Sequence, residues 1–465
     1  MLVVISDLHL RDDPDLTVSP QTTRGFIEQN LIPQVRAANA TELTLVFLGD
    51  MFDINRSPYW VDGRSTESDG YSYSPWSHWR ETLEGIARVR KVKAPARDDA
   101  RFRRSELEHH VLQVLDGIAA ANYRSLALWN EFKNGSSELW GGAGNRPEVH
   151  YRLVPGNHDR LVQYSERTRQ AMARLLSLDN DPAAPFPWIE SYPEYSVLAF
   201  HGHQLSRDNF GGRDAPDDPV SSPWYDFPSL GDVVTVTFGN RLLHRIRDEA
   251  GLGPEDSVIR SLEEIDLVRP QMAGFRWLRE WGLGRDPGTE RVVTNAALAE
   301  LDAFLRDDFV RWWGLLTPLQ SLLLKLGIGK PHDLEGAWKL FAGRSGSSRT
   351  LQERNRGLVE QITGGRFGAW LRREHPKVRH LVSGHTHQAT LVPLTGRAGG
   401  DPAHERVYFN TGTWLDVVEA GRFGGFARRQ QVTHVAFYQP GEEVKPGGAR
   451  SHWEFWQGSM REGAA

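Results

Sequence analysis

Five short apolar runs recur along the chain, and each is followed at once by polar or charged residues. The runs span residues 2–5, 43–48, 149–154, 195–200 and 378–382. Runs of this length are typical of strands that are buried on both faces of a sheet. Residues 23–38 have the apolar spacing of a helix, which Pro33 should kink or divide. This strand–helix–strand order predicts a parallel sheet of α/β type.

Two long intervals interrupt the alternation of strands and helices. Residues 54–148 begin with an irregular stretch rich in Ser, Gly, Asp and aromatics, followed by helical patterns at 79–92 and 103–122. Residues 205–376 are mostly helical in pattern and contain many tryptophans. Connections of this length are functional or disordered more often than not, and these are too aromatic for disorder. We therefore expect a first insert at 54–148 and a second, mostly helical insert at 205–376, both acting as caps.

The tail of the chain alternates in a way that predicts antiparallel strands. These strands are expected at residues 390–394, 406–409, 432–438 and 453–456. Together with the apolar runs they predict one α/β core. It would be assembled from residues 1–53, 149–204 and 377–457.

Composition narrows the chemistry that the chain can carry. It has 465 residues, a net charge of −5 and no cysteine. The absence of cysteine excludes disulfides, thiolate-bound zinc, iron–sulfur clusters and thiol nucleophiles, and leaves His, Asp, Glu and Asn as ligands. The first residues are apolar without a basic leader, so we expect a cytoplasmic protein. No apolar run reaches the roughly 18 residues of a membrane span.

Residues that suit a metal follow each of the five apolar runs. They are Asp7 and His9, Asp50 and Asp53, Asn157 with His158 and Asp159, His201 and His203, and His385 and His387. Each alone could cap a helix or close a turn, but five such groups at strand ends favour one shared site. If the strand continued beyond residue 382, the side chains of His385 and His387 would point the same way. The backbone must turn after the strand, and Gly384 permits that turn.

These residues fall into an ordered set of motifs. The set reads DLH at 7–9, GDMFD at 49–53, GNHD at 156–159, HGH at 201–203 and GHTH at 384–387. In content and order it resembles the motifs of the calcineurin-like metallophosphoesterases. The resemblance implies a four-layer α/β/β/α sandwich of two mixed sheets with helical cap insertions. It also implies a dinuclear metal site, in which a carboxylate bridges two ions about 3.5–4 Å apart.

The resemblance assigns roles to individual residues. Asp7, His9 and His387 would hold a first divalent ion; Asn157, His201 and His385 would hold a second; and Asp50 would bridge them. His158 would contact the phosphoryl or leaving-group oxygen, with Asp53 orienting its ring. Asp159 has a weaker claim to support that ring, and the role of His203 stays open. Mixed ligands of this kind suit Mn, Fe, Zn, Ni or Co, with Mn favoured.

The expected activity is hydrolysis of a phosphodiester or nucleotide-like small molecule by a hydroxide that bridges the metals. Four alternatives stay open. A pyrophosphatase acting on a lipid-linked nucleotide would typically carry Arg where this chain has His158. A phosphomonoesterase of the phosphoprotein phosphatase type would continue past Asp53 with Arg-Gly, whereas here Ile54 and Asn55 follow. A nuclease is supported only by a local basic string at 88–104, since the net charge gives no support to nucleic acid. The fourth is a catalytically silent binding module.

Residues 309–328 form the most apolar segment of the chain. Pro318 and the charges of Arg311 and Lys325 exclude a membrane span. We favour a buried cap helix. A dimer interface and a peripheral contact with a membrane or a lipid-like substrate stay open.

Overall fold

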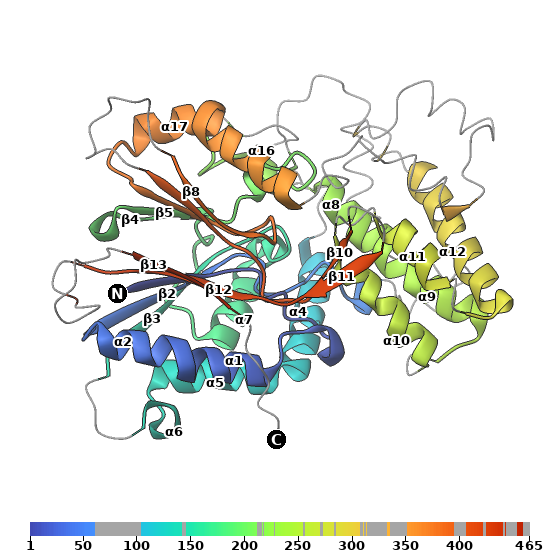
Figure 1. The fold of residues 1–465 in the computed structure, drawn as a ribbon, viewed down its shortest axis with the longest axis horizontal. Coiled ribbons are helices and arrows are strands. Elements are labelled where there is room, and N and C mark those ends of the chain that lie inside the picture. Colours follow the sequence, from blue (N-terminus) through green and yellow to red (C-terminus); the bar gives the residue numbers. More distant parts are fainter. Residues whose placement is uncertain are drawn as a thin grey trace.

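The computed structural model shown in Figure 1 is a mixed α/β structure with three mixed sheets. It describes residues 1–60, 104–141, 146–211, 216, 218–226, 228–253, 256–269, 273–282, 285–306, 310, 313, 333–334, 351–394, 406–421, 425–439, 442 and 453–458. The helix predicted at 79–92 and most of the basic string at 88–104 lie outside these residues.

The first five-stranded sheet has the order β13-β12-β1-β2-β3. Its strands are β1 (Leu2–Ile5), β2 (Glu42–Leu48), β3 (Glu148–Val154), β12 (Val432–Phe437) and β13 (Trp453–Gly458). The pairs β1–β2 and β2–β3 are parallel, which confirms the parallel pairing expected for the first three apolar runs. Antiparallel β12 and β13 complete the sheet, so β1 lies inside it rather than at an edge.

The second five-stranded sheet has the order β4-β5-β7-β9-β8. Its strands are β4 (Ile189–Tyr192), β5 (Val197–Phe200), β7 (His380–Ser383), β8 (Ala389–Pro393) and β9 (Val407–Thr411). The inner strands β5, β7 and β9 are parallel, and the edge strands β4 and β8 are antiparallel to their neighbours. The two parallel pairs place the loops after β5 and β7 at one end of the sheet.

A third, three-stranded sheet joins the second insert to the tail. It has the order β11-β10-β6 and comprises β6 (Val268–Arg269), β10 (Val417–Ala420) and β11 (Phe426–Arg429). Strand β6 pairs in parallel with β10, and Arg269 lies opposite Glu419. The sequence analysis did not predict β4, β6, β10 or β11. The division of the chain into a core and two caps stays a prediction.

Apolar side chains from the two large sheets pack against each other. Val4, Val46 and Val154 of the first sheet share a buried cluster with Val382 and Phe409 of the second. The opposite faces are covered by helices (Figure 1). Both faces of β1 and β5 are therefore buried, which accounts for their uninterrupted apolar sequences.

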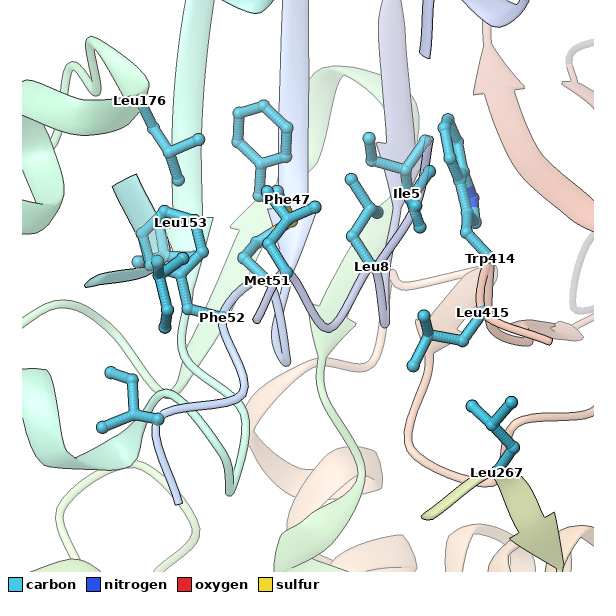
Figure 2. Close-up of a cluster of buried hydrophobic side chains, with 14 of the residues drawn as sticks. Ile5, Leu8, Phe47, Met51, Phe52, Leu153, Leu176, Leu267, Trp414 and Leu415 are labelled. Carbon is cyan, nitrogen blue, oxygen red and sulfur yellow. The ribbon is translucent and has the colours of Figure 1, made fainter. Parts of the chain in front are cut away.

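Helix α5 (Tyr123–Asn134) and the helix that follows β1 cover the first sheet on its outer face. Phe47 of β2 meets Trp129 of α5 edge to face at 5.5 Å between ring centroids. Figure 2 shows Phe47 grouped with Ile5, Leu8 and Trp414 at this face. On the second sheet, Phe200 lies 4.7 Å from Phe367 of α17 (Arg366–Glu374), again between ring centroids.

Pro33 divides the helix that follows β1, as predicted. The segment runs as α1 (Pro20–Phe26), a π-helix η2 (Ile27–Leu31) and α2 (Ile32–Ala37), with Pro33 in the first turn of α2. The next described helices are α4 (Arg104–Ala121), which matches the pattern at 103–122, then α5, α6 (Ser137–Trp140) and α7 (Glu166–Leu176). Single 3₁₀ turns occur at Pro14–Leu16, Pro58–Trp60, Arg160–Tyr164, Pro193–Tyr195, His203–Leu205 and Pro223–Asp226.

The described part of the second insert is mostly helical, as its sequence pattern predicted. Its elements are α8 (Leu230–Val233), the π-helix η8 (Val234–Gly239), α9 (Asn240–Ala250), α10 (Ser257–Glu263), the 3₁₀ helix η9 (Glu264–Leu267), α11 (Gly274–Gly282), α12 (Pro287–Arg306), α16 (Leu351–Gly364) and α17. Of the apolar segment 309–328, only Val310 and Trp313 lie within the described residues, and both are buried. Among the described residues, no helix has the length and apolarity to cross a membrane.

Candidate metal centre

The loops that follow β1 and β2 run side by side and carry the first candidate ligands. Asp7 N–H donates to the Gly49 carbonyl at 3.0 Å, and His9 N–H donates to the Asp50 carbonyl at 2.8 Å. The parallel register of the two strands thus continues into their loops. The loop after β7 joins them, because His385 N–H donates to the Asp7 carboxylate at 3.1 Å.

Three groups of candidate ligand atoms result, each with all its atoms within 4.8 Å of one another. The groups are Asp7, His9, Asp50 and His387; Asp50, His201 and His385; and His9, Asp53 and His158. Asp50 belongs to the first two groups and His9 to the first and third. All of these side chains are buried except those of His158 and His385, which are partly exposed.

The backbone at the candidate ligands is unusual. Asp7, His9, Asp50, His385 and His387 all have positive φ, between 47° and 72°. This left-handed conformation costs roughly 1–2 kcal/mol per residue that is not glycine, and such residues cluster at functional sites. Gly384 itself is not in the left-handed region, because the two histidines after it adopt that conformation themselves.

Gly384 is instead required by a close approach. A Cβ atom there would lie 2.1 Å from Asp7 Oδ2. The other two glycines that precede candidate ligands are similarly placed. A Cβ at Gly156 would lie 2.1 Å from Asp50 Oδ1, and one at Gly49 would lie 2.3 Å from His201 Nδ1. Each glycine therefore gives room to a ligand side chain from a neighbouring loop.

In the first group, His9 and His387 bring their Nε2 atoms within 3.0 Å of each other. Asp7 Oδ1 lies 3.4 Å from His387 Nε2 and 3.7 Å from His9 Nε2. Asp50 Oδ2 is 3.8 Å from His9 Nε2. Two imidazole nitrogens and two carboxylates thus converge on one buried point.

In the second group, His201 is oriented as a metal-binding histidine usually is. Its Nδ1–H donates to the Leu48 carbonyl at 2.9 Å, which leaves the electron pair on Nε2. That Nε2 lies 3.1 Å from Asp50 Oδ2 and has no hydrogen-bond partner among the described residues. His385 Nδ1 is 3.0 Å from Asn157 Oδ1.

These contacts allow a test of whether the residues suit a divalent metal. An imidazole electron pair that faces a carboxylate oxygen or a second imidazole at about 3 Å is repulsive unless a proton or a metal ion lies between them. The donors are neutral nitrogen, carboxylate oxygen and amide oxygen, which first-row divalent metals accept. The buried His/Asp groups are therefore compatible with a metal site.

The pKa values of the site residues also favour the binding of a cation. Burial acts to raise the pKa values of Asp7 and Asp50, but His201 and the other histidines around each carboxyl together outweigh it, and both values lie below the ordinary range. Burial acts to lower the pKa of His201, yet Asp50 and Asp7 raise it to about 9. Burial lowers the pKa of His387 to about 3. The two carboxylates thus stay ionised and attract a cation.

His158 and Asp53 form a pair beside the ligand groups. Asp53 Oδ1 lies 2.5 Å from His158 Nδ1, and Asp53 Oδ2 accepts from Arg11 at 2.9 Å. The His158 backbone N–H donates to Asp50 Oδ1 at 2.8 Å. Burial acts to lower the pKa of His158, but the charges of Asp53 and Asp50 raise it to about 9. With a side chain 14% exposed, His158 is accessible where Asp53 is not.

Asp159 and His203 differ from the residues around them. The position of Asp159 had suggested that it supports the His158 ring, but it does not. Its carboxylate accepts hydrogen bonds from the backbone N–H groups of Met51, Phe52 and Gly156 at 2.8–3.3 Å. It therefore joins the loops after β2 and β3. His203 is buried, and neither ring nitrogen has a hydrogen-bond partner among the described residues.

Sequence reasoning missed several residues that border the site. Arg269 of β6 donates through Nε to His387 Nδ1 at 3.3 Å. Asn209 places its amide nitrogen 3.3 Å from His385 Nε2. Arg11 pairs with both Asp53 and Asp266, the second at 3.1 Å. Of these three residues, only Arg11 could have been suspected from the sequence, because it follows His9 by two positions on the same loop.

No protein-family model matches this chain, and a search of curated proteins finds no match either.

Proposed function

We propose that this protein is a dinuclear metal-dependent phosphoesterase of the calcineurin-like metallophosphoesterase type. The observation that carries the proposal is the position of Asp50, whose carboxylate belongs to two ligand groups at once. A shared carboxylate is what two neighbouring divalent ions require to offset their repulsion. The ordered motifs at the five strand ends support the same assignment.

The proposed architecture is a four-layer α/β/β/α sandwich. In support, apolar side chains of the two large sheets pack together, and helices pack on the outer face of each. The carboxyl ends of β1, β2, β3, β5 and β7 carry the candidate ligands, which is where ligands collect in parallel sheets.

In this proposal Asp7, His9 and His387 hold one ion, Asn157, His201 and His385 hold the other, and Asp50 bridges. When bound, divalent metals supply Lewis-acid chemistry and acidify water. The chain's own contribution is the His158–Asp53 pair. Asp53 accepts a hydrogen bond from His158 Nδ1–H and fixes the ring, so that the protonated ring can give its Nε2 proton to the departing oxygen.

Hydrolysis of two chromogenic esters tests the proposal. We expect the full chain with Mn²⁺ to release p-nitrophenolate from bis-(p-nitrophenyl) phosphate, and less readily from p-nitrophenyl phosphate. A protein that binds metal but turns over neither ester, with Mn²⁺, Fe²⁺, Zn²⁺, Ni²⁺ or Co²⁺, would contradict the proposal and favour the catalytically silent binding module.

A further inference from the structure

A pocket opens beside His158 and Asp53, and the second insert forms most of its wall. The wall comes from the π-helix η8, the start of α9, the η9 turn and α11. Its apolar side chains are Val234, Phe238, Leu242, Ile265, Phe275 and Leu278. π-Helical turns are uncommon and are often found at functional sites. The pocket thus places an apolar surface directly beside the accessible histidine of the site.

Besides His158 and Thr235, the polar lining of the pocket consists of three arginines and two carboxylates. Arg11 pairs with Asp53 at 2.9 Å and with Asp266 at 3.1 Å. Arg56 pairs with Asp266 at 2.5 Å. Arg269 is different, because it forms no ion pair with any described carboxylate although it is only 6% exposed. A buried guanidinium without an anionic partner is costly, and bidentate contact with a carboxylate or phosphate would offset that cost.

The hydrogen bonds of Arg269 leave part of its guanidinium available. Nη1 donates to the carbonyls of Asp266 and Val268, at 2.6 and 3.0 Å. Nε donates to His387 Nδ1 at 3.3 Å. Nη2 has no hydrogen-bond partner among the described residues, so this nitrogen is the part of the guanidinium that can bind an anion.

We propose that this pocket is the substrate site for phosphoesters that carry an apolar organic group. Arg269 binds a phosphoryl oxygen, and the apolar wall built by η8, η9 and α11 holds the organic group. The proposal rests on the proposed function for the identity of the anion. It names a substrate class that the metal ligands alone do not define.

A series of alkylphosphonates tests the pocket without hydrolysis. Methyl-, butyl- and hexylphosphonate are titrated by calorimetry into the full chain loaded with Mn²⁺. Burial of each added methylene is expected to tighten Kd about fourfold until the pocket is filled. An affinity that does not change along the series would overturn the proposal without any variant protein.

Two substitutions test the apolar wall and Arg269 independently. Val234→Glu should flatten the dependence of Kd on chain length, whereas Val220→Glu, the same change at an exposed valine, should leave that dependence as in the wild type. Arg269→Gln should weaken all three phosphonates by a similar factor, about tenfold or more, and keep the dependence on chain length. Metal content measured on each variant excludes loss of metal as the cause. Unchanged affinity in Arg269→Gln would remove Arg269 from the site.

Hydrolysis of p-nitrophenyl alkyl phosphates distinguishes failure of the pocket from failure of the function. All members of that series share one leaving group, so only the alkyl group varies. Turnover that is independent of chain length, together with flat phosphonate binding, overturns the pocket and leaves the phosphoesterase proposal standing. Binding that depends on chain length without any turnover overturns the proposed activity and leaves the pocket standing.

Discussion

Asp53 Oδ1 lies 2.5 Å from His158 Nδ1, and the same carboxylate also accepts from Arg11. The buried Asp53 carboxylate therefore binds one ring nitrogen of His158. The other side of the ring is left free to face the pocket that His158 lines. An acid that is oriented through Nδ1 and accessible elsewhere on the ring is suited to protonate a leaving group.

We predict that His158→Ala retains its metal and loses rate by about 10²–10⁴-fold on substrates with poor leaving groups, the range typical of removing a general acid. The loss should shrink for p-nitrophenolate, because a stable anion departs with little protonation. Rates of wild type and variant across a series of leaving-group pKa values check this. An equal loss across the series would assign His158 to electrostatic contact instead.

Asp53→Asn should move the pH dependence of the reaction. The Asp53 charge is the largest influence that raises the pKa of His158, which lies at about 9. Removing that charge lowers the pKa, so the alkaline decline in rate should begin at lower pH than in wild type. The pH–rate profile on a poor leaving group measures the shift, and metal content at each pH is the control. A profile displaced upward or unmoved would contradict the prediction.

Asp50→Ala should abolish activity and, at the same time, the binding of two metals per chain. Asp50 Oδ2 lies 3.1 Å from His201 Nε2 and 3.8 Å from His9 Nε2, so one carboxylate serves both groups. Elemental analysis of the purified variant counts the metals per chain. Two metals retained in an active Asp50→Ala protein would exclude the bridging role.

Gly384→Ala should lower metal affinity although no ligand is changed. The added Cβ would lie 2.1 Å from Asp7 Oδ2, so the carboxylate must move. Gly364→Ala is the matched control, since it lies in helix α16 with nothing within 4 Å of its Cβ position. We expect the control to bind metal as wild type and to be more stable by about 0.4–1 kcal/mol. Competition with a chelator for Mn²⁺ distinguishes the two variants, and equal affinities would show that Asp7 is not displaced.

The metal-free protein should lose stability between pH 6.5 and 9. Asp50 and Asp7 raise the pKa of His201 from 6.5 to about 9, so its stabilising proton is bound below pH 6.5 and is lost as the pH rises through 9. With Mn²⁺ the trend should reverse, because deprotonated ligands bind metal more tightly. Urea midpoints at pH 7 and 9, with and without metal, check both signs. A metal-free His201→Gln variant should show a smaller decrease than wild type.

The sequence predicted the strands of the parallel pairs well, because the signal lies within the residues of each strand. β1, β2, β3, β5 and β7 lie inside or beside parallel ladders, and their apolar runs are readable without knowledge of their neighbours. The edge strand β4 and the strands β10 and β11 have mixed burial, and β6 has only two residues, so their sequences carry no such run. Their existence depends on pairing between residues far apart in the chain.

The residues of the candidate site also differ in whether the sequence alone could reveal them. Residues such as Asp7 and His385 stand in motifs at strand ends, where position alone suggests a role. Arg269 stands in no motif, and only the pairing of Val268 with Val418 brings it near His387. Gly384 was identified by its position before a strand-end histidine, but the side chain for which it makes room was not. Its requirement is steric, which can be seen only once the Asp7 carboxylate is placed across from it.

The central position of β1 has a consequence for synthesis of the protein in the cell. Val4 pairs with Val46 on one side and with Val435 on the other. Ribosomes add about 5–20 residues per second, so one edge of β1 waits on the order of half a minute or more for β12 to be made. During that interval the nascent chain exposes an unpaired apolar strand, which is the kind of surface that chaperones bind. A ribosome stalled between residues 388 and 431 would therefore release a chain prone to aggregate, even though every candidate metal ligand had already been translated.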